Sequence, residues 1–382
     1  MAGQWDIFCA VVDNYGDIGV TLRLARQLVA EQGVAVRLWV DDLRSLQPLC
    51  PATSLTEPQQ WLEGVEVRAW TVEATADVVP GEVVIEAFAC ELPATFIAAM
   101  AAQPRPPLWL NLEYLSAEDW VAGCHALPSP QPSGLRKFFF FPGFTEGTGG
   151  LLREGDLLAC RDALQADVAA RTAFLERLGV TLQAGARLIS LFAYENTGLG
   201  EWLEAMAGGE EAVQLLVPQG RIQAQLQDWL GVAAMQPGQV WQRGCLQVQL
   251  LSFMEQGDYD RLLWCCDFNA VRGEDSFVRA QWAARPLLWH IYQQAEDAHW
   301  DKLEAFLGLY VEGLSEPAAL ALLGLWRAWN AGQGMGPAWQ VLQPHWLELA
   351  EHARQWSARK AAYPDLATAL AQFYRNSLSC AA

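Results

Sequence analysis

The sequence has few basic residues for its size. Lysine and arginine together number 25, against 44 aspartates and glutamates, so the net charge is −19. Non-specific binding to nucleic acid or to anionic membranes requires clustered Lys and Arg side chains. We therefore expect neither nucleic acid nor a membrane among the partners, and an acidic chain suits an enzyme that acts on small molecules or on a basic protein segment.

The sequence also lacks patterned metal ligands and patterned cysteines. Nine cysteines occur without any Cys-x-x-Cys pair, and the five histidines show no metal-ligand grouping. Such scattered cysteines are typical of buried free thiols, and a disulfide framework or a zinc site would need regular spacing. The sequence therefore predicts no metal site of this kind.

Long apolar runs are missing as well. No run of about 18 uncharged apolar residues occurs, so we expect no transmembrane helix. The stretch from Met1 to Asp6 has no basic segment of the kind that opens a signal peptide, and it leads directly into a strand-like run. These features predict a cytoplasmic protein. With 52% apolar residues over 382 positions, the chain can bury the cores of about two domains.

Short apolar runs alternate with helical patterns in two successive sets. In the first set we expect strands at 6–12, 34–40, 83–87, 108–112 and 137–141, helices at 21–32, 92–102 and 117–122, a surface loop at 127–132 and one long helix at 156–178. In the second we expect strands at 187–194, 213–217, 246–253, 267–271 and 287–292, helices at 199–207, 222–230 and 258–264, and helical structure from 294 to 375. The pattern predicts an α/β protein with two Rossmann-like domains, 1–182 and 183–359, that face each other across a cleft, with residues 360–382 packed on the first.

One stretch combines a cation, a glycine and two carboxylates where a strand passes into a helix. It runs from Ala270 to Arg279 and contains Arg272, Gly273 and Ser276. A helix N-terminus carries about half a positive charge and unpaired N–H groups, so it can bind a phosphate, and an arginine beside it adds a forked donor. The alternative is an ordinary helix start in which Asp275 or Ser276 is the N-cap.

A second informative stretch follows the first predicted strand. Residues Asp13 to Gly19 occupy the position of a dinucleotide fingerprint but lack Gly-x-Gly-x-x-Gly, and Asp13 and Asp17 would repel a pyrophosphate. Their i, i+4 spacing can place both carboxylates on one side, as a base or as a grip on a cationic substrate. The alternative is a turn in which Asp17 caps the helix and the other aspartate is solvated.

Aromatic residues accompany the predicted phosphate turn. Each lies at the end of a predicted strand or just inside a predicted helix: Phe192, Tyr194, Phe253 and Phe277. Aromatic residues at these positions can form a clamp for a nucleobase. The alternative is that they belong to the core. Asp258-Tyr-Asp260 matches the Asp-x-Asp of metal-dependent sugar transferases, but it precedes an amphipathic helix, where a helix cap is the simpler interpretation.

Together these stretches resemble one known family. The chain is similar over essentially its whole length to the bacterial protein-arginine rhamnosyltransferases of the EarP family, in Asp13-Asn-Tyr-Gly-Asp-Ile-Gly19, Phe192-Ala-Tyr194, Ser252-Phe-Met-Glu-Gln256, Arg272-Gly-Glu-Asp-Ser-Phe277 and Pro286-Leu-Leu-Trp-His-Ile-Tyr292. The resemblance implies a GT-B type, inverting, metal-independent enzyme without a cofactor. It would transfer L-rhamnose from dTDP-β-L-rhamnose to one arginine of translation elongation factor P, which activates the factor to rescue ribosomes stalled at consecutive prolines.

The resemblance also implies roles for individual residues. Asp13 and Asp17 would be the catalytic pair, with Glu274 as a further essential carboxylate, and Phe192 and Phe253 would sandwich the thymine. The remaining donor-binding residues would be Tyr194, Gln256, Arg272, Asp275 and Ser276, together with Asn14, Tyr15 and Gly16 in the first loop. The second domain would thus bind the nucleotide sugar and the first the acceptor protein.

Physical chemistry agrees with this assignment. An arginine guanidinium has a pKa above about 12, so two carboxylates can grip and align it more readily than one can deprotonate it. We therefore expect Asp17 to be the nearer base and Asp13 to orient the acceptor. Two other classes stay open from the residues alone: a nicotinamide-dependent oxidoreductase, disfavoured by the missing glycine fingerprint, and a binding module that holds elongation factor P without modifying it.

Overall fold

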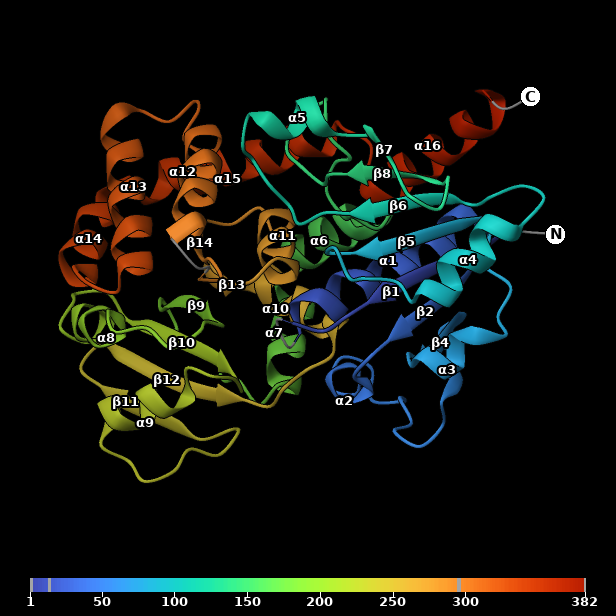
Figure 1. The fold of residues 1–382 in the computed structure, drawn as a ribbon. Helices are drawn as coiled ribbons and strands as arrows, with labels where there is room; N and C mark the ends of the chain where they lie inside the picture. Colours follow the sequence, from blue (N-terminus) through green and yellow to red (C-terminus); the bar gives the residue numbers. More distant parts are fainter. Residues whose placement is uncertain (1–2, 13–14, 294–296, 381–382) are drawn as a thin grey trace. The chain divides into compact units, whose positions relative to one another are not determined.

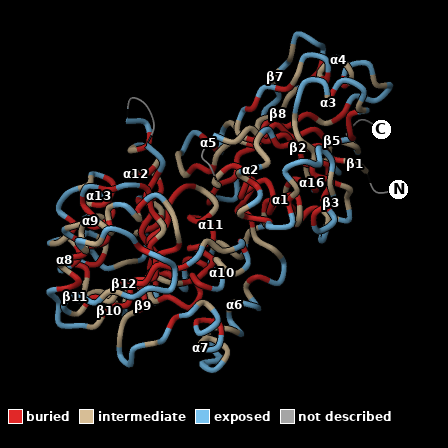
Figure 2. Tube along the Cα trace, turned by 90° about the horizontal axis from the view of Figure 1, so that it is seen from below, coloured by how far each residue is buried: buried red, intermediate tan, exposed pale blue. Residues whose placement is uncertain are grey.

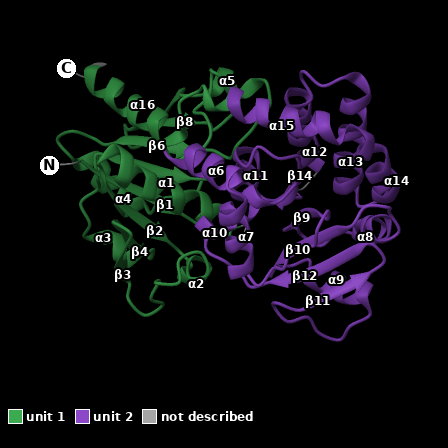
Figure 3. Cartoon of the chain, turned by 180° about the vertical axis from the view of Figure 1, so that it is seen from behind, with its two compact units in different colours: residues 1–155, 360–382 green, residues 156–359 purple. Residues whose placement is uncertain are grey.

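The computed structural model describes residues 3–12, 15–293 and 297–380. The chain divides into two compact units, residues 1–155 with 360–382 (unit 1) and residues 156–359 (unit 2) (Figure 3). Each unit has a central sheet with helices packed on it (Figure 1).

Unit 1 is built on a mostly parallel sheet with strand order β3-β4-β2-β1-β5-β6-β8-β7. The strands are β1 (Gln4–Cys9), β2 (Ala35–Val40), β3 (Gln59–Leu62), β4 (Val65–Ala69), β5 (Val83–Ala87), β6 (Leu108–Leu112), β7 (Pro128–Pro130) and β8 (Arg136–Phe140). The helices are α1 (Gly16–Gln32), α2 (Leu43–Leu46), α3 (Val72–Ala76), α4 (Ala94–Ala102), α5 (Trp120–Cys124) and α16 (Leu366–Cys380). The central strand β1 is buried along almost its whole length and pairs in parallel with β2 and β5. This burial on both faces is the reason for its nearly continuous apolar sequence.

The proline-rich segment that the sequence predicted to be a surface loop forms the edge strand β7. It pairs antiparallel with β8, with Pro128 opposite Phe138 and Pro130 opposite Arg136. Proline lacks a backbone N–H, which an edge strand can spare on its outer side. The loop prediction was wrong because the prolines mark the edge of the sheet and do not exclude a strand.

The C-terminal helix α16 belongs to unit 1, where it packs against α1. Phe373 meets the rings of Phe138 and Phe140 edge-on, with centroid distances of 5.4 and 5.8 Å. Tyr374 meets Trp5 of β1 in the same way at 5.5 Å. These aromatic contacts fasten the end of the chain to the sheet of unit 1.

Unit 2 contains a second mostly parallel sheet, in the order β11-β12-β10-β9-β13-β14. The strands are β9 (Arg187–Leu191), β10 (Val213–Pro218), β11 (Val240–Arg243), β12 (Leu246–Leu251), β13 (Phe268–Arg272) and β14 (Leu287–His290). The helices are α6 (Leu157–Ala166), α7 (Val168–Arg177), α8 (Leu199–Ala207), α9 (Gln223–Leu230), α10 (Gln256–Cys265), α11 (Asp275–Trp282), α12 (Ala298–Tyr310), α13 (Glu316–Ala331), α14 (Met335–Leu342) and α15 (Trp346–Ala361), with a 3₁₀ turn, η2 (Gln343–His345). Buried residues run through α11 from Ser276 to Trp282 (Figure 2).

The boundary between the units lies at residue 155, and the predicted boundary at 182 is corrected accordingly. The predicted single helix 156–178 is two helices, α6 and α7, which meet at Asp167. Its carboxylate accepts from the Ala170 N–H at 2.9 Å and caps α7. These helices belong to unit 2 because Phe174 and Leu175 of α7 pack in one apolar cluster with residues of its sheet, including Leu188 and Leu216.

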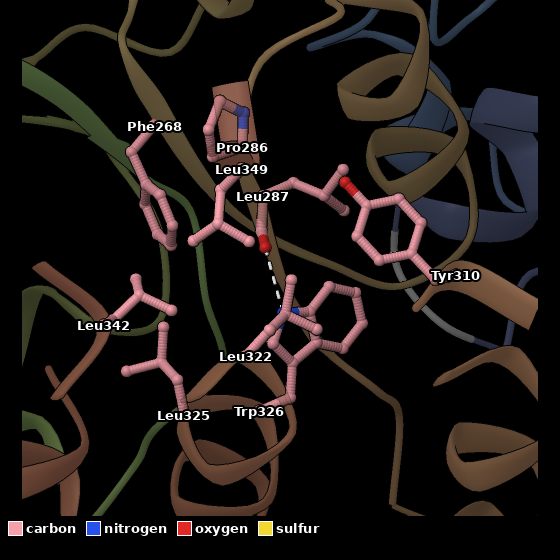
Figure 4. A pocket seen from close by; sticks show the side chains of 9 residues that line it. All are labelled: Phe268, Pro286, Leu287, Tyr310, Leu322, Leu325, Trp326, Leu342 and Leu349. Atoms are coloured by element: carbon pink, nitrogen blue, oxygen red, sulfur yellow. Dashed lines mark hydrogen bonds between the residues drawn. The ribbon is translucent and has the colours of Figure 1, made fainter. Parts of the chain in front are cut away.

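The C-terminal helices of unit 2 enclose a small apolar cavity (Figure 4). It is lined by Phe268, Pro286, Leu287, Tyr310, Leu322, Leu325, Trp326, Leu342 and Leu349. The Trp326 indole N–H points to the Leu287 carbonyl, at 3.0 Å, and is satisfied there. This cavity belongs to the packed core. Throughout the described residues, every helix is too short or too polar to span a membrane.

Candidate functional site

The turn between β13 and α11 is shaped by Gly273. This residue has φ = 62°, in the left-handed region where glycine carries no steric penalty. Its carbonyl accepts from the Trp289 indole N–H at 2.7 Å, which ties the turn to β14. The helix begins at Asp275 with Glu274 in the N-cap position. The alternative of Asp275 or Ser276 as the N-cap is therefore wrong, since both lie within the helix, and the Ser276 hydroxyl donates back to the Arg272 carbonyl.

Arg272 ends β13 between two aromatic rings. Its guanidinium carbon lies 4.7 Å from the ring centroid of Phe192 and 4.6 Å from that of Tyr194, both of which follow β9. The Phe192 N–H donates to the Ala270 carbonyl at 2.8 Å and so keeps this segment alongside β13. Arg272 is 5% exposed. Cation–π contacts fix the orientation of a guanidinium, so the donors of this arginine are held in place at the end of the strand that leads into α11.

Two further predicted residues lie where β12 passes into α10. Phe253 is half-buried, and its N–H donates to the Gln219 side-chain oxygen at 3.3 Å. Gln256 is the first residue of α10, and its amide lies 3.4 Å from a carboxylate oxygen of Asp275. This contact connects the starts of α10 and α11. Arg272 belongs to the same group because it ends β13, the strand that leads into α11.

His290 was not among the predicted site residues. It ends β14, is 3% exposed and lies edge-on to Tyr194, with the ring centroids 5.3 Å apart. Burial, together with the positive charge of Arg272, lowers the pKa of His290 to about 4. The imidazole is consequently neutral at neutral pH. The sequence offered one signal, since His290 stands in the predicted strand 287–292 and in the stretch Pro286 to Tyr292 that carries the family resemblance.

Two of the residues considered from the sequence belong elsewhere. Phe277 is a core residue: it stacks on Trp289 with a centroid distance of 4.0 Å and meets Phe306 edge-on at 4.7 Å. Asp260 pairs with buried Arg279, whose Nε and Nη2 atoms lie 3.0 and 2.6 Å from its two carboxylate oxygens. Because Asp260 is engaged by this arginine, the structure does not support Asp258-Tyr-Asp260 as a metal-binding motif. Among the described residues, no group of three or more His, Cys, Asp or Glu side chains is arranged to hold a metal ion.

The first predicted loop lies in unit 1, between β1 and α1. Asp13 and Asn14 lie outside the described residues. Tyr15 precedes α1, and Gly16 and Asp17 begin it. Asp17 is 2% exposed, and its two carboxylate oxygens accept from the Val12 N–H at 2.8 Å and from the Tyr114 hydroxyl at 3.1 Å. The carboxylate is thus held by two donors at the carboxyl end of the unit 1 sheet.

A comparison with known families shows which family the chain belongs to. The family model of the "Elongation-Factor P (EF-P) rhamnosyltransferase EarP" matches residues 5–375. The chain belongs to the EarP family. The members of this family that it resembles are named protein-arginine rhamnosyltransferases: that of Pseudomonas putida is 66% identical over 99% of this chain and 100% of its own, and that of Pseudomonas aeruginosa is 57% identical over 98% and 99%.

Solved structures support the same family and its fold. One described as the "Structural basis for EarP-mediated arginine glycosylation of translation elongation factor EF-P" is 50% identical, with a TM-score of 0.72 over 98% of this chain and 99% of that one. A glycosyltransferase from Rickettsia africae is 8% identical with a TM-score of 0.51 over 99% and 97%, a likeness of fold alone. The predicted α/β class of GT-B type, with two Rossmann-like domains, is confirmed. So is the prediction that this EarP family member is a protein-arginine rhamnosyltransferase.

Proposed function

We propose that this EarP family member transfers L-rhamnose from dTDP-β-L-rhamnose to a single arginine of translation elongation factor P, with inversion at the anomeric carbon. The observation that carries the proposal is the position of Arg272, which is buried against the rings of Phe192 and Tyr194 at the end of the strand that leads into α11. Buried cationic donors at a helix N-terminus suit a diphosphate. Modification would activate the factor for the rescue of ribosomes stalled at consecutive prolines.

The donor would bind to unit 2. Arg272 and the N–H groups that open α11 would hold the diphosphate and stabilise its charge as it leaves. Phe192 and Phe253, both half-buried after strands of this unit, would enclose the thymine. Tyr194, Gln256, Asp275 and Ser276 would complete the contacts to ribose and diphosphate, and no metal would be needed to neutralise the leaving group.

The acceptor arginine would bind to unit 1. Asp17 has its carboxylate fixed by Val12 and Tyr114, and such an oriented carboxylate can grip a guanidinium edge. Asp13 would orient the same guanidinium, and Asn14, Tyr15 and Gly16 would add contacts to the donor. Glu274 would add a further carboxylate near the sugar, where developing positive charge needs stabilisation.

The transfer is a single displacement. A guanidinium nitrogen forms a bond to the anomeric carbon while the bond from that carbon to the diphosphate oxygen breaks, so the β-linked donor gives an α-linked product. Free arginine is too weak an acid to lose its proton first. The nitrogen becomes acidic as the new bond forms, and Asp17 then accepts the proton while Arg272 receives the leaving diphosphate.

The intact mass of elongation factor P tests the proposal. Incubation with this chain and dTDP-β-L-rhamnose should add the mass of one deoxyhexose, and replacement of the acceptor arginine by lysine should abolish the gain. A binding module that only holds the factor predicts complex formation with no mass change. An oxidoreductase predicts thermal stabilisation by NAD, whereas we expect stabilisation by dTDP-β-L-rhamnose and none by NAD.

A further inference from the structure

A strained turn follows β5 in unit 1. Phe88 and Ala89 have φ values of 59° and 56°, so two adjacent residues with side chains occupy the left-handed region. This conformation is strained for a residue with a side chain, and such strain persists only where the surroundings enforce it. The Phe88 N–H donates to the Leu112 carbonyl at 2.7 Å, and the Ala89 N–H donates to the Asn111 side chain at 3.1 Å. The turn is thereby fastened to the carboxyl end of β6.

The turn delivers an aromatic ring to the carboxylate proposed as the base. Phe88 stacks on Tyr114 with a centroid distance of 4.4 Å and an interplanar angle of 17°. Both rings are half-buried. The Tyr114 hydroxyl donates to Asp17 at 3.1 Å, so ring stack and carboxylate form one connected group. An aromatic surface that is only half covered, beside a buried carboxylate, is suited to a planar cation.

We propose that Phe88 and Tyr114 form the aromatic wall of the acceptor-arginine site. The guanidinium plane lies against this wall while its edge donates to Asp17. Phe88 contacts the acceptor, and Tyr114 is a positioning residue that holds the Asp17 carboxylate in place. A lysine ammonium has no plane to lay on the rings and no fork for the carboxylate, so the wall selects arginine. This inference rests on the proposed function, because it needs an arginine as the acceptor.

Substitutions at Phe88 separate an aromatic contact from simple packing. Phe88→Leu keeps an apolar side chain of similar size but removes the π face. We expect kcat/KM for elongation factor P to fall about tenfold, with dTDP affinity unchanged, and Phe88→Tyr to recover most of the loss. Tyr114→Phe keeps the stack and removes the hydroxyl, so kcat should fall while KM for the factor is retained. Wild-type kcat/KM in Phe88→Leu would overturn the proposal.

A measurement on the unaltered enzyme guards against misfolded variants. Butylguanidinium should inhibit the wild-type enzyme competitively with elongation factor P, at least about tenfold more strongly than butylammonium. Equal inhibition by the two cations would also overturn the aromatic wall. Failure of the proposed function looks different: the wild-type enzyme would then add no deoxyhexose to the factor. If the wild-type enzyme is active and the Phe88 variants keep its kcat/KM, the aromatic wall is refuted and the proposed function still stands.

Discussion

The guanidinium of Arg272 lies between the rings of Phe192 and Tyr194, 4.7 and 4.6 Å from their centroids. Both rings come from the segment after β9, and the arginine ends the neighbouring strand β13. The cation is therefore oriented by the fold before any ligand arrives. Preorganised donors need no rearrangement when charge develops on a leaving group, which is why we attribute the stabilisation of the diphosphate to this residue.

Arg272→Lys should preserve the fold but weaken the donor site. Lysine keeps the charge and loses the planar fork and the stacking on both rings. We expect dTDP to bind at least about tenfold more weakly and kcat to fall by about 100-fold, the usual effect of losing one well-placed donor. Titration calorimetry and steady-state kinetics measure the two quantities. Arg243→Lys is the matched control, because Arg243 lies over the Trp229 ring at 4.4 Å, pairs with the exposed Glu204 at 2.6 Å and is not among the residues assigned to the donor, so it should change both quantities far less. Unchanged dTDP affinity in Arg272→Lys would contradict the assignment.

Much of this site followed from the sequence because it depends on local pattern. An apolar run, then Arg272 and Gly273, then an amphipathic segment is sufficient to predict a strand, a turn and a helix, and the structure has β13, a left-handed glycine and α11 in these places. The unaided pattern did not reveal which aromatic rings approach the arginine. Phe277 is adjacent in sequence but stacks on Trp289 in the core, whereas Phe192 and Tyr194 arrive from a distant strand.

The remaining errors arose where tertiary contacts override local pattern. Two segments with no clear alternation, 59–62 and 65–69, form the strands β3 and β4, because pairing with each other and with β2 stabilises them. The break at Asp167 depends on a single side-chain cap, which periodicity does not detect. Helices α6 and α7 precede the second set of strands and still pack on it, which displaced the predicted boundary. In each instance the decisive partner lies outside the segment.

The buried ion pair Asp260–Arg279 should matter more for stability than an exposed pair of equal geometry. The side chains of Asp260 and Arg279 are 6% and 2% exposed, and Asp260→Ala leaves a buried guanidinium without its carboxylate. We expect a loss of about 3–5 kcal/mol in the free energy of unfolding. Glu304→Ala is the control: Glu304 and Arg327 form an equally forked pair, with both distances 2.7 Å, at 42% and 49% exposure. That change should cost less than about 1 kcal/mol. Similar losses for the two variants in urea denaturation would refute the prediction.

The neutral state of His290 predicts a fall in stability on mild acidification. Its pKa is lowered from 6.5 to about 4 in the folded protein, chiefly by burial. Between these values the unfolded chain binds a proton that the folded chain does not, so stability is full above pH 6.5 and declines as the pH falls toward 4. The group accounts for roughly 3 kcal/mol over this window. Urea denaturation at several pH values should show a shallower decline in His290→Phe, with a residual slope from His125 and His352, whose pKa values are also lowered by burial. An unchanged slope would show that His290 titrates normally.

Asp17→Asn should separate catalysis from acceptor binding. The asparagine oxygen can still accept from the Val12 N–H, and the Tyr114 hydroxyl can turn to accept from the new amide, so the loop and α1 should stay folded. The variant loses the base that takes the proton from the acceptor nitrogen, for which a loss of about 10²–10⁴ in kcat is typical. The asparagine oxygen keeps an acceptor for the guanidinium but loses the charge, so we expect the affinity for elongation factor P to fall by about tenfold, far less than kcat. Asp13→Asn, in contrast, should mainly weaken acceptor binding if Asp13 orients the arginine.

A neighbouring carboxylate supplies the control for this experiment. Asp41 is exposed and accepts from the Val11 N–H at 2.9 Å, one residue from the backbone group that Asp17 binds. Asp41→Asn alters the same loop without removing the proposed base, so its kcat should stay close to the wild-type value. Intact-mass time courses with saturating dTDP-β-L-rhamnose give kcat for each variant, and surface plasmon resonance gives acceptor affinity. Equal losses of turnover in Asp13→Asn and Asp17→Asn, with acceptor binding intact in both, would remove the ground for separate roles, because only loss of the base is expected to lower kcat far more than acceptor affinity.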